Sequence, residues 1–102
     1  MPEIHLMNVK NKFKIENAVY VNCMRPGILS NPFYMKNEDQ RELVLQKFKR
    51  YLWEQMQNDT PVNQELNRLA QCDKPIVLIC CCIPKPCHTQ IIKSAIEYLR
   101  KK

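Results

Sequence analysis

A continuous apolar run near the end of the chain limits the possible folds more than any other feature. The residues from Ile76 to Cys82 are all apolar, and they follow a predicted turn at Asp73-Lys74-Pro75. A run without alternating polar residues is typical of a strand that is covered on both faces, as in a parallel sheet flanked by helices. We therefore expect this segment to be a buried strand in an α/β fold.

The remaining patterns supply the other elements of such a fold. Residues 4–10 alternate in part, as in a half-buried or edge strand, and residues 17–22 form a β-branched and aromatic run that is typical of a more central strand. Apolar residues at helical spacing predict a long helix over roughly 38–58 and a second helix from Thr60-Pro61 to near Gln71. A last helix is predicted from about Cys87 onward.

The elements thus follow the order strand, strand, helix, helix, strand, helix. This order predicts one small α/β domain over residues 1–102, with three or so strands covered by three helices in two or three layers. Two helices separate the second and third strands, so these strands can run parallel through a crossover connection.

Composition excludes several classes of protein. Hydrophobic residues make up 45% and charged residues 25% of the 102 residues, which is the balance of a soluble globular domain. The single glycine, Gly27, excludes glycine-rich phosphate-binding loops. No apolar run approaches the roughly 20 residues of a membrane span, and no leader segment is recognisable, so we expect a cytoplasmic protein with reduced cysteines. The net charge of +6 favours a nucleotide or nucleic acid as partner, or simply solubility.

The segment from Cys80 to His88 is the main candidate for chemistry. It lies where a buried strand ends and a helix begins, which is where α/β sheets bind ligands. Unpaired backbone N–H groups at the helix start attract an anion, and Lys85 adds positive charge. The same field should make Cys87 more acidic than a free cysteine. Cys87 as nucleophile and His88 as proton carrier are therefore the candidate catalytic residues.

The same cysteines are also candidates for zinc. Cys80 and Cys82 share one face of the strand, and a turn could return Cys87 and His88 to them as further ligands. Adjacent residues are not expected to reach the same metal easily, which favours the alternative of small apolar thiols packed at a tight strand end. The spacing excludes a redox pair separated by two residues and a phosphatase loop. We interpret two other cysteines, Cys23 and Cys72, as buried structural thiols outside the site.

Two motifs together resemble a known family. They are the signature C-x-C-x-P-x-x-C-H, from Cys80 to His88, and an upstream Arg25 followed by Asn31-Pro32-Phe33. Over roughly residues 17–99 the chain is similar to bacterial and bacteriophage proteins catalogued as a domain of unknown function, number forty-three twenty-six. The resemblance implies a compact Rossmann-like fold and no particular activity. Cys81 stands where the family usually has tryptophan.

Parallel second and third strands would bring both motifs to one edge of the sheet. Arg25 and Lys85 could then hold a phosphate or carboxylate, and Asn31 could contact a polar edge of the ligand. For Phe33, core packing is favoured over stacking on a base. The leading hypothesis is a domain that binds a nucleotide-like or nucleic-acid ligand at this edge, with Cys/His chemistry. The alternative is a non-catalytic protein-interaction module, encoded by a phage or a bacterium, with structural or zinc-binding cysteines. A host protein is one partner that such a module could bind.

Overall fold

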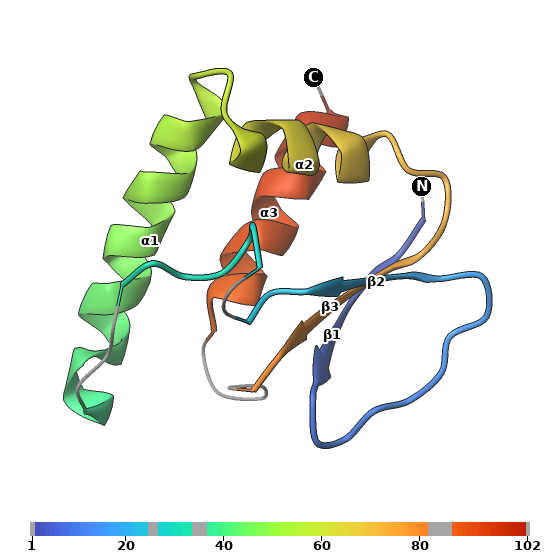
Figure 1. The fold of residues 1–102 in the computed structure, drawn as a ribbon, viewed down its shortest axis with the longest axis horizontal. Coiled ribbons are helices and arrows are strands. Elements are labelled where there is room, and N and C mark those ends of the chain that lie inside the picture. The colour runs from blue at the N-terminus through green and yellow to red at the C-terminus, as the bar shows by residue number, and fades with distance from the viewer. Residues whose placement is uncertain (1, 25–26, 34–36, 82–86, 102) are drawn as a thin grey trace.

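The computed structural model describes residues 2–24, 27–33, 37–81 and 87–101. The elements in these residues are β1 (Ile4–Asn8), β2 (Val19–Asn22), a 3-10 turn η1 (Glu38–Gln40), α1 (Arg41–Met56), α2 (Pro61–Ala70), β3 (Ile76–Cys80) and α3 (His88–Arg100). Their order confirms the predicted alternation and a small α/β fold (Figure 1). The predicted long helix begins as the 3-10 turn, and α-helical geometry follows from Arg41.

The described strands form a parallel sheet in the order β1-β3-β2. Ile76 of β3 pairs with Ile4 of β1 and with Val19 of β2, so the predicted parallel pairing of the second and third strands is confirmed. The prediction that the second strand is the more central one is wrong. β2 lies at an edge and alternates between half-buried and exposed residues, whereas β3 is buried along almost its whole length. A continuous apolar run marks the central strand more reliably than β propensity does.

The core lies between the three helices and one face of the sheet (Figure 1). Each helix contributes buried apolar residues at spacings of three and four, which place them on one side of the helix. The sheet contributes Ile4, Ile76 and Leu78 to this cluster. The helical residues of the core are Phe48 and Leu52 of α1, Val62, Leu66 and Leu69 of α2, and Ile92, Ala95 and Ile96 of α3. No helix in the described part of the chain has the length and apolar character needed to cross a bilayer.

The start of α2 depends on a local cap that the sequence predicts. The Thr60 hydroxyl accepts a hydrogen bond from the backbone N–H of Asn63 (3.1 Å) and donates one to the carbonyl of Gln55 (3.2 Å). Pro61 occupies the first helical position, where a missing N–H costs nothing.

Thr60→Ala should lower the free energy of unfolding by about 1 kcal/mol, because the N–H of Asn63 loses its acceptor. Thr60→Ser keeps the hydroxyl and should retain most of the stability. Urea unfolding of both variants measures the difference. Equal losses in the two variants would show that the hydroxyl does not cap this helix.

Candidate metal centre

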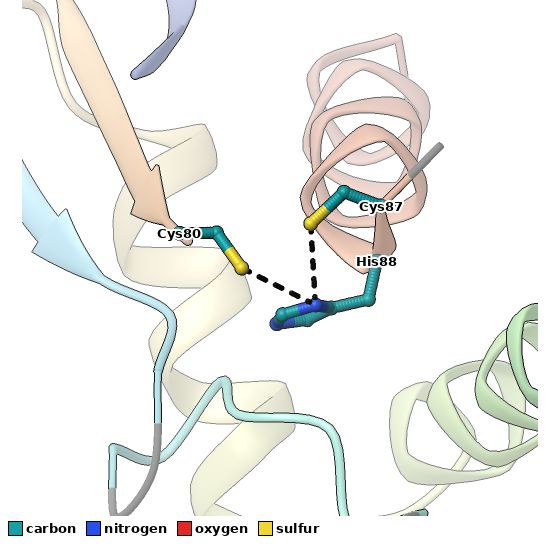
Figure 2. Close-up of side chains that lie close together, drawn as sticks. All are labelled: Cys80, Cys87 and His88. Atoms are coloured by element: carbon teal, nitrogen blue, oxygen red, sulfur yellow. Dashed lines mark hydrogen bonds between the residues drawn. The ribbon is translucent and has the colours of Figure 1, made fainter. Parts of the chain in front are cut away.

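Three ligand-type side chains meet where β3 ends and α3 begins. Cys80 is the last residue of β3, Cys87 is the N-cap of α3, and His88 is the first residue of that helix. Figure 2 shows the two sulfurs directed toward the imidazole ring. The Sγ–Nδ1 distances to His88 are 3.6 Å from Cys87 and 4.0 Å from Cys80. The ligand atoms of all three side chains lie within 4.8 Å of one another.

The expectation that Cys87 and His88 could not easily converge is wrong. Cys87 has extended backbone angles (φ −143°, ψ 153°), and the helix begins at the next residue. This change of backbone conformation between the two residues breaks the regular geometry of a strand, in which neighbouring side chains point to opposite faces. Both side chains therefore reach the space beside Cys80.

The separations agree with a tetrahedral zinc site. With Zn–S of about 2.3 Å and Zn–N of about 2.0–2.1 Å, a sulfur and a nitrogen ligand lie about 3.6 Å apart at the tetrahedral angle. The Cys87 sulfur is 3.6 Å from Nδ1 of His88, and the Cys80 sulfur is 0.4 Å farther away, at 4.0 Å. Both sulfur–nitrogen separations are therefore within about 0.4 Å of the separation expected in a tetrahedral zinc site.

The orientation of the His88 ring is fixed by a hydrogen bond at Nε2, the nitrogen that faces away from the two sulfurs. Its Nε2 lies 2.8 Å from the backbone carbonyl oxygen of Cys23, which can only accept a hydrogen bond. Nε2 therefore carries the proton and donates it, so in the neutral ring Nδ1 presents its lone pair to the two sulfurs. The ring of Phe48 contacts the imidazole in a T-shaped arrangement, with 5.1 Å between centroids. A histidine ligand held by a carbonyl on its other nitrogen is the usual arrangement in metal sites.

The carbonyl of Cys23 is positioned by the end of β2. The Cys23 N–H donates to the carbonyl of Ile79 (2.9 Å), which extends the pairing of β2 with β3 by one residue. Gly27 lies so close to the end of β2 that a Cβ at this position would be 2.7 Å from the carbonyl oxygen of Asn22. This close approach explains why the only glycine of the chain occurs here. The residue that follows β2 thus contacts both the end of β3 and the first residue of α3.

The local environment favours a thiolate at Cys87. A hydrogen bond from Cys80 is the largest of the effects that lower the pKa of Cys87, to about 3; burial opposes it, and a hydrogen bond from the backbone N–H of Thr89 acts in the same direction as Cys80. The Thr89 hydroxyl is fully buried and has no hydrogen-bond partner of ordinary geometry among the described residues. The thiolate is the form that binds metals and attacks electrophiles.

The trio is shielded from solvent. Cys80 and Cys87 are each 2% exposed, and His88 is 7% exposed. A buried anion requires a counter-charge or several hydrogen bonds. A divalent cation bound by these three residues would supply that counter-charge.

Cys23 differs from Cys87 in its ionisation. Burial, followed by repulsion from Cys87, raises the pKa of the Cys23 thiol from 9.0 to about 12. A pKa that is raised in the folded state means that folding favours the neutral thiol. This contribution to stability is complete below about pH 9 and is lost as the pH rises toward about 12.

The free energy of unfolding of the unmodified chain should therefore fall more steeply between about pH 9 and 12 than that of Cys23→Ala. Urea unfolding across this range measures the two slopes. Cys81→Ala, at an exposed cysteine, should keep the steep dependence. Parallel curves for the unmodified chain and Cys23→Ala would contradict the assignment.

The other predicted site residues are only partly described. Asn31 accepts a hydrogen bond through Oδ1 from the backbone N–H of Phe33 (2.9 Å), so it fixes the local turn, and a contact with a ligand stays a prediction. Phe33 is half-buried and packs against the core, as predicted. The predicted roles of Arg25, Cys82 and Lys85 fall outside the described residues.

Sequence reasoning missed the role of Cys23, whose carbonyl holds His88. The signal available was its position directly after the second strand, beside the end of the third.

Comparison with known proteins gives one family match. A family model described as "Domain of unknown function (DUF4326)" matches residues 4–98, which extends the predicted resemblance to include β1. No curated protein and no solved structure matches the chain. Because the match covers nearly the whole fold, including both edges of the sheet and the Cys/His trio, the chain belongs to the domain-of-unknown-function family DUF4326.

Proposed function

We propose that this domain binds a zinc ion through Cys80, Cys87 and His88. The observation that carries the proposal is the set of ligand atoms within 4.8 Å of one another, combined with the hydrogen bond that directs Nδ1 of His88 toward the sulfurs. Two thiolates and one imidazole are a donor set that zinc prefers. The fourth ligand is either Cys82, which the sequence predicts for this role, or a water molecule.

The metal would join parts of the chain that are distant in sequence. It would tie the end of β3 to the start of α3, and His88 would extend this connection to the end of β2 through the Cys23 carbonyl. With four protein ligands such a site is structural, and with a bound water it keeps an open position for a substrate. The burial of the trio supports the structural role.

Titration with cobalt(II) under reducing conditions tests the proposal. Cobalt bound by two thiolates gives strong thiolate-to-metal charge-transfer absorption, which carboxylate sites do not give. We expect this absorption to saturate at one equivalent and to disappear when zinc is added. Absence of charge-transfer absorption in the folded, reduced protein would overturn the proposal.

The other predicted activities concern the same edge of the sheet. A catalytic role for Cys87 and His88 is supported by the lowered pKa of Cys87, and it requires substrate access to side chains that are buried. A nucleotide-like or nucleic-acid ligand at this edge is supported by the parallel ends of β2 and β3 beside the start of α3. A host-protein partner is compatible with a structural zinc ion.

A further inference from the structure

A pocket separate from the Cys/His trio lies between Phe33 and one side of α1. Its volume is about 350 Å³, which is within the usual range for small-molecule sites. Leu43, Lys47, Arg50 and Glu54 of α1 line it. These residues are spaced by four, three and four positions, so they form one stripe along the helix.

Aromatic rings form one wall of this pocket. Phe33 and Tyr51 contact each other in a T-shaped arrangement, with 6.0 Å between centroids and an interplanar angle of 87°. The Asn31 side chain holds the backbone of Phe33 in place, and both rings are half-buried. Rings at right angles, fixed by packing, offer a rigid apolar surface on which a planar group can stack.

Positive charge lies beside the aromatic wall. Lys47 and Arg50 are exposed, and neither forms an ion pair with another described residue. Arg50 can bind a phosphate through two parallel N–H donors, and Lys47 adds a second cation one turn away. Glu54 supplies a carboxylate that can accept hydrogen bonds from hydroxyl or amino groups.

We propose that this pocket binds a nucleotide, with the base against Phe33 and Tyr51 and the phosphate at Lys47 and Arg50. An aromatic wall, two cations with no ion pair to the described residues, and a nearby acceptor are the three kinds of group that a nucleotide requires. The nucleotide can be free or part of a single strand, since both present a base next to a phosphate.

The pocket is connected to the Cys/His trio through ring contacts. Tyr51 packs on Phe48 (5.9 Å between centroids), and Phe48 packs on His88. The proposal does not require the metal, so each of the two sites can fail its own test without affecting the other.

Isothermal titration of the full chain tests the nucleotide site. The probes are adenosine monophosphate, a single-stranded oligothymidylate and inorganic phosphate. We expect one or both nucleotide probes to bind, and inorganic phosphate to bind at least about tenfold more weakly because it has no base to stack. Binding of adenosine monophosphate alone identifies a free nucleotide, and binding of the oligonucleotide identifies a strand. Equal affinity for phosphate, or no binding of either nucleotide probe at millimolar concentration, overturns the proposal.

One arginine variant and one lysine variant distinguish binding in this pocket from nonspecific attraction of the ligand to the positive charge of the protein. Arg50→Ala should weaken binding about tenfold or more, because a charge-assisted pair of hydrogen bonds is lost. Lys49→Ala removes the same charge from the neighbouring position on α1, outside this pocket, and should change binding by less than about twofold. Equal effects of the two variants would contradict a specific site.

Phe33→Leu tests the stacking surface separately. It keeps an apolar side chain against the core but removes the ring, so we expect affinity for the nucleotide probes to fall several-fold. The melting temperature of this variant shows whether the fold is preserved. Unchanged affinity in the folded variant would overturn the stacking role.

Discussion

Replacing Cys87 with serine is expected to weaken zinc binding at least about a hundredfold, because loss of a direct thiolate ligand should exceed the 10–100-fold effect of changing an outer hydrogen-bond partner. Cys87 lies closer to Nδ1 of His88 than Cys80 does, and its lowered pKa means that little free energy is needed to deprotonate it before it binds the metal. Competition with a chelating dye of known zinc affinity measures the change.

Two other cysteines provide matched controls for this substitution. Cys81 is exposed and directly follows Cys80, and Cys72 lies at the end of the turn after α2. Neither belongs to the group of converging ligand atoms among the described residues. Cys81→Ser and Cys72→Ser should therefore bind zinc within about threefold of the unmodified chain. Zinc affinity that survives Cys87→Ser but is lost in a control would place the metal elsewhere.

Phe48→Ala is expected to lower the free energy of unfolding by about 3 to 5 kcal/mol. Phe48 is 1% exposed and is one of the largest side chains in the core. Its ring also contacts the rings of both Tyr51 and His88, so its removal leaves a cavity between α1 and the start of α3. Native domains are stable by only about 5 to 15 kcal/mol, so the variant should be close to unfolding.

Urea unfolding measures this loss, and two variants serve as controls. Leu43→Ala, at a 52% exposed position of the same helix, should cost less than about 0.5 kcal/mol. Phe48→Leu refills much of the cavity and should recover part of the stability. A loss of less than about 1 kcal/mol in Phe48→Ala would show that the ring is not a central packing element.

The elements that could be predicted from the sequence are those whose pattern of apolar residues indicates which of their side chains are buried. The apolar run of β3 predicts a strand covered on both faces, and the structure places it at the centre of a parallel sheet. The helices are likewise marked by apolar spacing, and Thr60-Pro61 marks the start of α2 within one residue. Strand position within the sheet was less accessible, because β-branched and aromatic residues in β2 suit an edge as well as a centre.

The three side chains whose ligand atoms converge were all singled out by the sequence, but the way in which they converge was not. The family signature and the position at the end of a strand both indicate Cys80, Cys87 and His88. Their convergence depends on the backbone angles of Cys87, which spacing along the sequence does not reveal. The contact between His88 and the Cys23 carbonyl joins residues 65 positions apart and involves a backbone atom, so no side-chain pattern could indicate it.

X-ray absorption at the zinc edge, on protein reconstituted with one equivalent of zinc, shows directly whether the thiols bind the metal. We expect sulfur ligands at about 2.3 Å together with nitrogen at about 2.0 to 2.1 Å. Two sulfurs correspond to Cys80 and Cys87 with His88 and a water, and three correspond to the addition of Cys82. A spectrum with only oxygen and nitrogen ligands would show that the thiols do not bind zinc, and it would contradict the proposed centre.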